Sequence, residues 1–220
     1  MNNKTWRIKR LCVMAMICAM AYAIVAFVRI PVLLWLSYEP KDVLITIGAF
    51  LFGPLSAAIM SAVVSLVEMI TISNTGIIGM VMNVLSTCLF ACTASAIYRK
   101  TRRLSGAILG LVLGTVAATA GMLLWNYLIT PLYMEATRQE VAGMLLPLFL
   151  PFNLFKTTLN SALTILLYKH ISSALRSAKL IPPADKVTTS TKNYTVIVTI
   201  AATLLLIGLV VVLLMWNGII

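Results

Sequence analysis

Three polar residues, Asn153, Lys156 and Asn160, interrupt an apolar stretch that runs from about residue 146 to 172. In a helix, which turns by about 100° per residue, they fall within an arc of about 60° on one face. Asparagine supplies both donor and acceptor, and lysine supplies a charged donor. Polar groups at membrane depth are costly and commonly functional, so this face predicts recognition of a hydrogen-bonding molecule. Pro147 and Pro151 are expected to open the start of the helix towards a cavity. The alternative is that Lys156 extends its amine to the membrane interface.

Further polar and aromatic residues lie near the ends of other apolar stretches. One group precedes the stretch above: Trp125, Asn126 and Tyr127. Another lies between the first two apolar stretches: Trp35, Tyr38, Glu39, Lys41 and Asp42. An interfacial aromatic belt is the favoured interpretation of Trp125 and Tyr127, but it does not account for Asn126. Glu68 and Asn83 are interpreted as ties between helices. If these groups converge, they form an outward-facing pocket suited to a flat, neutral molecule, because an ion pathway needs rings of charge.

The sequence lacks the residues that common catalytic centres need. No G-x-x-x-x-G-K-[ST] phosphate loop occurs, so we expect no ATP hydrolysis through a Walker site. His170 is the single histidine, and it lies at the basic end of its apolar stretch. The sequence therefore offers no histidine for a Ser–His dyad within the membrane and cannot form a zinc H-E-x-x-H motif, which needs two. Cys88 and Cys92 share a helix face, but no histidine or carboxylate accompanies them to bind a metal. We therefore expect no enzyme, no metal and no cofactor.

The elements that must position these residues are membrane helices. The chain is 61% hydrophobic and 10% charged, whereas a soluble domain has about 25% charged residues. Its apolar runs approach the roughly 20 residues that a helix needs to cross the bilayer core. They fall at about 8–30, 43–72, 76–98, 105–130, 146–172 and 194–216. The net charge of +11 lies in short clusters beside these runs. Such clusters orient a protein in the lipid bilayer, so we expect no nucleic-acid partner.

Gly53-Pro54 divides the long run 43–72, and charge decides how. With a cytoplasmic N-terminus that carries Lys4, Arg7, Lys9 and Arg10, a hairpin at Gly53 places the two later basic clusters, 99–103 and 169–192, inside as well. A single span would force the first of them outside. The first arm, about 43–52, measures only about 15 Å and must be shielded within the bundle. Loops 31–42, 73–75 and 131–145 are then outside, and we expect a multi-pass protein of the cytoplasmic membrane.

The prediction is an all-α integral membrane protein in three parts. Residues 1–175 form a six-helix bundle, 176–193 a cytoplasmic linker containing Pro182-Pro183, and 194–220 an additional C-terminal transmembrane helix. Small residues at a spacing of four let helices approach closely in lipid. The glycine row Gly106, Gly110 and Gly114 predicts packing within the bundle. The alanine row Ala15, Ala19 and Ala23 predicts either such packing or the docking of a partner subunit.

Three stretches resemble those of the riboflavin-specific S components of energy-coupling factor (ECF) transporters: residues 47–54 (IGAFLFGP), 75–79 (TGIIG) and 150–156 (LPFNLFK). The resemblance covers about residues 8–175. It implies a six-helix bundle that binds riboflavin near its outer face as a transported ligand. It also implies a transmembrane T component and two ABC-type ATPases as partners, consistent with the missing phosphate loop. The family usually has six helices, so the run 194–216 is a departure.

The resemblance also implies roles for single residues. Asn126, Asn153 and Lys156 would hydrogen-bond the flavin, and the alanine row on the first helix would contact the T component. Glu39, Gly76 and Gly79 match regions that touch the ligand. That Trp35 and Tyr38 cover the flavin ring is an inference from their chemistry.

Other functions stay open at this point. An S component for a different vitamin would share the fold, because fold does not fix function. A self-sufficient secondary transporter would predict inverted repeats, and none is evident in the sequence. A membrane enzyme would need a nucleophile–base pair or a metal cluster.

Overall fold

The computed structural model describes residues 3–33, 36–73, 75–133 and 137–181, together with Thr199, Thr203 and Gly208. The predicted helix 194–216, most of the predicted linker 176–193, and Trp35 lie outside the described residues. The helix α8 itself continues to Ser177, so the boundary at residue 175 falls inside its last turn.

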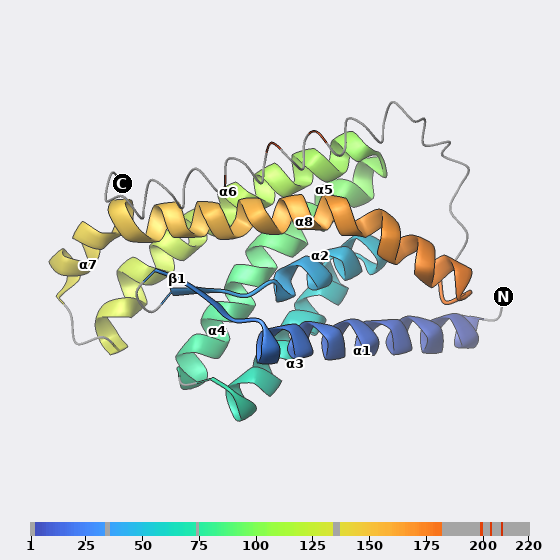
Figure 1. Cartoon of the computed structure of the whole chain (residues 1–220), viewed down its shortest axis with the longest axis horizontal. Coiled ribbons are helices and arrows are strands. Elements are labelled where there is room, and N and C mark those ends of the chain that lie inside the picture. The colour runs from blue at the N-terminus through green and yellow to red at the C-terminus, as the bar shows by residue number, and fades with distance from the viewer. Residues whose placement is uncertain are drawn as a thin grey trace.

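The described residues form six helical stretches, which confirms the predicted bundle (Figure 1). They are α1 (Asn3–Phe27), α2 (Lys41–Phe52), α3 (Pro54–Thr71), α4 to α5 (Gly76–Thr87 and Thr93–Thr101, joined by the π-helix Cys88–Cys92), α6 (Leu104–Tyr133), and α7 to α8 (Arg138–Met144 and Leu150–Ser177, joined by the π-helix Leu145–Phe149). Five of the six are long and apolar enough to cross a membrane, and α2 is the exception.

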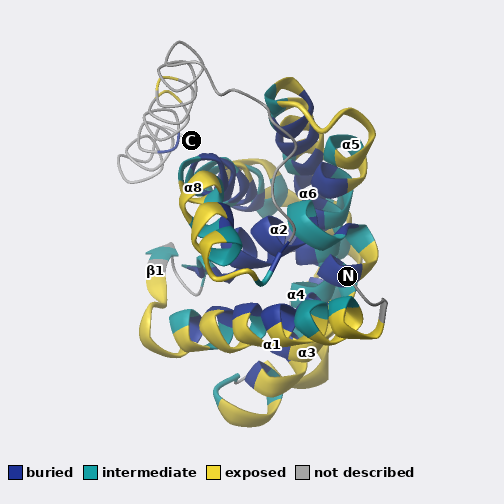
Figure 2. Cartoon of the chain, turned by 90° about the vertical axis from the view of Figure 1, so that its right-hand side faces the viewer, coloured by how far each residue is buried: buried dark blue, intermediate teal, exposed yellow. Residues whose placement is uncertain are grey.

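The break between α2 and α3 lies where the sequence predicts it. Gly53 has a φ of 95°, in the region that glycine adopts at little cost, and Pro54 occupies the first turn of α3. A Cβ at Gly53 would also lie 3.2 Å from the Arg99 guanidinium. The short arm α2 is buried from Lys41 to Ala49 and lies in the interior of the bundle (Figure 2). The predicted hairpin with a shielded first arm is confirmed.

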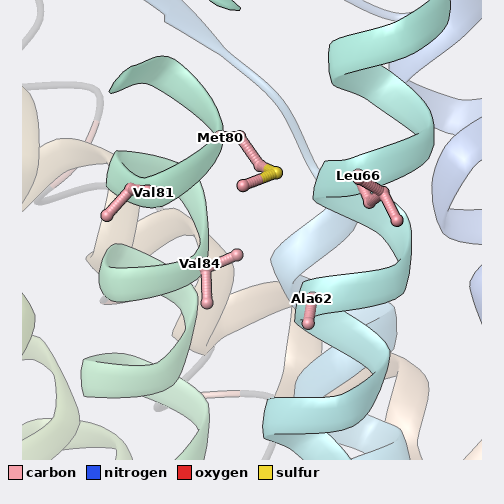
Figure 3. Close-up of a pocket in the computed structure, with 5 residues that line it drawn as sticks. All are labelled: Ala62, Leu66, Met80, Val81 and Val84. Atoms are coloured by element: carbon pink, nitrogen blue, oxygen red, sulfur yellow. The ribbon is translucent and has the colours of Figure 1, made fainter. Parts of the chain in front are cut away.

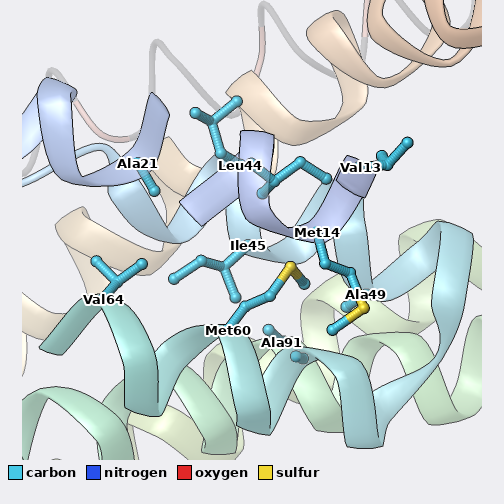
Figure 4. Packing of buried hydrophobic residues seen from close by; sticks show 11 residues of the cluster. Val13, Met14, Ala21, Leu44, Ile45, Ala49, Met60, Val64 and Ala91 are labelled. Carbon is cyan, nitrogen blue, oxygen red and sulfur yellow. The ribbon is translucent and has the colours of Figure 1, made fainter. Parts of the chain in front are cut away.

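Apolar packing holds α2 in place on one side. There, buried side chains of α2 pack with those of α1 and α3 in a cluster that includes Val13, Met14, Leu44, Ile45 and Met60 (Figure 4). Each large aliphatic side chain removed from lipid or water contributes through close packing, so this cluster fixes the depth of α2 against α1. On the other side, α2 packs against α8. The charged start of α2 is therefore held inside the bundle.

The glycine row packs within the bundle, as one interpretation predicted. A Cβ at Gly110 would lie 2.5 Å from the Ala94 carbonyl oxygen, and one at Gly114 would lie 2.7 Å from that of Phe90. Only glycine permits α6 to approach the backbone of α5 and the π-helix this closely. The alanine row behaves differently, because Ala15, Ala19 and Ala23 are all exposed.

Two predicted loops are shorter than expected. Residues 30–38 include an antiparallel hairpin of β1 (Ile30–Leu33) and β2 (Leu36–Tyr38), and α2 begins at Lys41. The loop expected over 131–145 is also wrong, because α6 runs to Tyr133 and α7 begins at Arg138. A capping box starts α7: the Glu140 N–H donates to the Thr137 hydroxyl, and the Thr137 N–H donates to the Glu140 carboxylate. The π-helix around Pro147 then carries the helix into α8 without a break.

Candidate functional site

A buried ion-pair chain begins in the segment between α1 and α2 and enters the bundle. The Lys41 side chain is only 1% exposed, and its ammonium lies 3.0 Å from the Glu39 carboxylate. The same ammonium donates to Glu68 on α3. Asn83 on α4 donates to Glu68 over 3.3 Å, which confirms the predicted tie between these helices. At the exposed end of this chain of ion pairs, the Arg29 guanidinium lies 2.7 Å from the Glu39 carboxylate.

Asp42 is the centre of a second buried group. One of its carboxylate oxygens accepts a hydrogen bond of 2.6 Å from the Thr87 hydroxyl. The other lies 3.3 Å from the Lys156 ammonium and 3.4 Å from the Asn160 amide nitrogen. The Asn160 carbonyl oxygen in turn accepts a 2.8 Å hydrogen bond from the Tyr38 hydroxyl. Asp42 therefore joins α2 to α4 and α8, and through Asn160 to β2.

The charges of this site balance. The four ion pairs found among the described residues join three cations, Arg29, Lys41 and Lys156, to three carboxylates, Glu39, Asp42 and Glu68. Taking a charge out of water costs several kcal/mol, so buried charges persist only when they are paired and hydrogen-bonded. Pairing thus keeps the five largely buried members inside an apolar bundle, and Arg29 supplies the balancing positive charge from the exposed end of the network.

The electrostatic environment of the outer segment follows from these contacts. Burial alone raises the pKa of Glu39, but the positive charges of Lys41, Lys156 and Arg29 more than offset it, so the net pKa lies below its ordinary value. Burial, followed by the negative charge of Asp42, raises the pKa of the Tyr38 phenol. The phenol therefore remains protonated and can donate its hydrogen bond to Asn160.

The polar face of α8 points into the bundle. Asn153 and Asn160 are buried, and the Lys156 side chain is 11% exposed. The pairing of Lys156 with Asp42 argues against an amine that extends to the membrane interface. Asn153 donates one amide hydrogen to the Phe149 carbonyl oxygen. An asparagine amide has two such hydrogens, so Asn153 retains donor capacity for a ligand.

Asn126 has the same arrangement on α6. It is 5% exposed, donates to the Met122 carbonyl oxygen and accepts from the Thr130 hydroxyl. The contacts between α6 and α8 place these helices side by side. The nearby indole nitrogen of Trp125 is buried without a hydrogen-bond partner among the described residues. Such a donor is costly to leave unpaired.

The two glycines of the predicted site lie elsewhere. Gly76 is exposed at the start of α4 with a φ of 57°, and a Cβ there would meet nothing within 4 Å. Gly79 is buried one turn later, against the Thr75 side chain. Neither is joined to the charged network by a described contact, so their role in binding stays a prediction. Tyr38 and Glu39 do join the network, and Tyr38 also lies 5.9 Å, centroid to centroid, from the Phe155 ring.

Part of this site differs from what the sequence predicts. Lys41 and Asp42 were expected in an outer loop, whereas they form the first turn of α2 and are buried. Arg29 and Thr87 were not singled out at all. The available signal was the scarcity of carboxylates, since the sequence has only six. In an apolar chain each buried carboxylate requires a cation or several donors nearby.

An apolar groove of about 340 Å³ lies between α3 and α4, and none of the residues that line it belongs to the charged network. Ala62 and Leu66 of α3 face Met80 and Val84 of α4 across it, and Val81 of α4 also contributes to its lining (Figure 3). Its lining offers no hydrogen-bonding side chain, whereas a site for a polar ligand needs a few placed polar groups. It does not match the predicted binding site.

The comparisons with known proteins agree on one family. The family model described as "ECF transporter, substrate-specific component" matches residues 9–168. A riboflavin transporter, RibU, of Staphylococcus aureus is 29% identical over 177 residues, which cover 76% of this chain and 93% of the relative. The RibU of Streptococcus thermophilus is 26% identical over 190 residues, covering 78% and 90%.

A solved structure has the same fold. It is described as the S component of a bacterial ECF transporter and superposes with a TM-score of 0.66 at 27% identity. The match covers 77% of this chain and 99% of that one. The family match, the helical bundle and the buried polar site lead to one conclusion. This chain belongs to the substrate-specific components of ECF transporters, as the sequence resemblance predicted, and is the substrate-binding membrane subunit of such a transporter.

Proposed function

We propose that this chain captures riboflavin at the outer side of the cytoplasmic membrane, as the S component of an ECF vitamin importer. The observation that carries the proposal is the polar interior between α2, α6 and α8, where Asn126, Asn153 and Lys156 are held inside an apolar bundle. The two relatives with the name riboflavin transporter align over about three quarters of this chain and support the choice of ligand.

The chemistry of the ligand suits these residues. The pyrimidine edge of the flavin alternates carbonyl oxygens with an N–H, and an asparagine amide answers both kinds of group. Asn126 and Asn153 each commit one amide hydrogen to their own helix and keep the other. Lys156 donates to a carbonyl or ribityl oxygen. Riboflavin is cargo in this proposal, and the chain carries out no catalysis and needs no cofactor.

The energy for transport comes from partners in this proposal. A transmembrane T component contacts the exposed alanine row of α1, where small side chains allow close helix approach. Two ABC-type ATPases bound to the T component hydrolyse ATP. The N-terminus of α1 lies in the cytoplasm, because Lys4, Arg7, Lys9 and Arg10 form a basic cluster there.

Uptake of labelled riboflavin tests the proposal as a whole. Cells that cannot make or import riboflavin would express this chain with the T component and ATPases of its source, or with ATPases whose Walker lysines are substituted. We expect uptake only with active ATPases, and no competition by thiamine or biotin. Uptake without the T component and active ATPases would contradict the ECF mechanism. Competition by thiamine or biotin would point to a different vitamin.

A further inference from the structure

The contact between Asp42 and Lys156 has a consequence for ligand choice. Lys156 is the cation on the polar face of α8, and Asp42 is the carboxylate found within ion-pair distance of it, at 3.3 Å. Asp42 is 2% exposed, so water screens this pair poorly. The other ion-pair contacts of the site join Arg29, Glu39, Lys41 and Glu68, and none of them includes Asp42 or Lys156.

We propose that Asp42 determines charge selectivity: by neutralising Lys156, it lets the site accept a neutral flavin and reject a phosphorylated one. The inference rests on the proposed function, since it takes riboflavin as the ligand. It adds a residue that does not itself need to touch the flavin. Asp42 acts through Lys156 and is a positioning residue.

The selectivity for neutral over phosphorylated flavin follows from the net charge around Lys156. A phosphate group carries a charge of about −1.5 to −2 at neutral pH. A lone buried lysine would attract it strongly, as phosphate-binding sites do with their cations. With Asp42 in place, the field of Lys156 is largely cancelled beyond the pair. The ammonium can still donate hydrogen bonds to neutral oxygens, because a lysine has three N–H donors.

Asp42 also fixes where Lys156 points. The Thr87 hydroxyl and the Asn160 amide hold the Asp42 carboxylate from two other directions. Lysine has a flexible four-carbon stem, and holding it in one rotamer before the ligand arrives lowers the entropy cost of binding. A purely structural role for Asp42 would affect protein stability and the affinities for both flavins equally. A role through Lys156 changes the ratio of the two affinities.

The test measures dissociation constants of detergent-purified protein for riboflavin and for riboflavin 5′-phosphate, by quenching of flavin fluorescence. In Asp42→Asn the site gains one net positive charge, and we expect the affinity for the phosphate relative to riboflavin to rise about tenfold. In Lys156→Gln the site gains one net negative charge, and the same ratio should fall by a similar factor. The double variant is neutral again, and its ratio should return to within about threefold of wild type.

Glu68→Gln is the matched control. It also adds one net positive charge to the buried site, but beside Lys41, which keeps Glu39 as a partner. We expect its affinity ratio to stay within about threefold of wild type, because the ammonium that loses a partner is that of Lys41, while Lys156 keeps Asp42. A ratio that rises as much as in Asp42→Asn would overturn the assignment to the Asp42–Lys156 pair.

The remaining outcomes separate this inference from the proposed function. If wild-type protein binds riboflavin and the ratio is unchanged in Asp42→Asn, the inference fails alone. If wild-type protein binds neither flavin, the proposed function is wrong, and the inference that rests on it is wrong as well. Should Asp42→Asn not fold, Lys156→Gln decides, since a ratio that does not fall contradicts the role of Lys156 as the paired cation.

Discussion

The interior beside α2 and α8 is buried and charged, whereas the face of α1 that points away from the bundle is exposed and uncharged. The polar interior holds two cations, Lys41 and Lys156, and three carboxylates among its described residues, all paired, with Arg29 at the exposed end of the network. The face of α1 that carries Ala15, Ala19 and Ala23 has no charge along those turns and is exposed, while Val13, Ile17 and Ala21 on the other side are buried. The difference fits the two tasks that we propose. We expect the interior to fix polar groups for a ligand and the α1 face to pack against a helix of a partner subunit.

The largest expected effect comes from breaking the interior at its most buried cation. Lys41→Met leaves Glu39 and Glu68 facing each other without the shared ammonium, and one partner removed from a buried pair costs about 3–5 kcal/mol. We expect a much lower Tm in detergent, measured by thermal unfolding. A Tm equal to that of wild type would mean that the network does not hold α2 in place.

The α1 face should respond in the opposite way. Ala19→Leu adds bulk to the proposed docking surface, and overpacking of about 1–3 kcal/mol should reduce riboflavin uptake by roughly tenfold or more. Riboflavin affinity of the purified protein should not change, because Ala19 is exposed. Ala120→Leu, at another exposed alanine on α6, is the control and should leave both uptake and binding intact. Loss of binding in Ala19→Leu would place the row inside the bundle.

A smaller effect is expected within the polar face of α8. Asn153→Ala removes a buried amide and should weaken riboflavin binding by roughly tenfold while the protein remains folded. Thr158→Ala is the control, since Thr158 lies about 140° around the same helix. Fluorescence titration of both variants checks the assignment. Equal affinities in the two variants would remove Asn153 from the site.

The pH dependence of stability should report on Glu39. Its pKa is lowered in the folded protein, so its ion pairs stabilise the fold above the ordinary value of 4.5 and lose this contribution as the pH falls through the lower folded value. We expect Glu39→Gln to have a lower Tm than wild type at pH 7 and to lose less Tm on acidification to about pH 3. Identical pH profiles would show that Glu39 is not ion-paired.

The smallest effect belongs to Arg29, the exposed end of the same chain of charges. Its side chain is 41% exposed, and exposed ion pairs contribute about 0–1 kcal/mol. Arg29→Ala should therefore shift the Tm by a small fraction of the Lys41→Met effect. A shift as large as that of Lys41→Met would mean that the outer end of the network is as tightly coupled as its centre.

The sequence predicted what local chemistry determines. Gly53-Pro54 marked the turn between α2 and α3, because few other residue pairs both permit a φ of 95° and start a helix. The spacing of Asn153, Lys156 and Asn160 placed them on one face, because helical geometry is fixed. The glycines of α6 marked a close approach. None of these inferences needed knowledge of which helices are neighbours.

The pairing of the charges could not be predicted in the same way. Asp42 meets Asn160 across 118 positions of sequence, and Lys41 meets Glu68 across 27. Such contacts depend on how α2 sits between α3 and α8, which is set by the apolar cluster around Leu44 and Met60. Lys41 and Asp42 also looked like loop residues, because charges are normally found outside membrane helices. The α7 helix was missed because its signal, the capping box of Thr137 and Glu140, is short.

We propose that this chain alone binds riboflavin, in the interior that contains Lys156. The decisive experiment is a titration of detergent-purified protein with riboflavin, with flavin fluorescence as the readout. We expect saturable quenching at about one flavin per chain, unaffected by thiamine or biotin, and weaker binding in Lys156→Ala. A folded wild-type protein that causes no quenching, or a Lys156→Ala variant that binds as tightly as wild type, would contradict it.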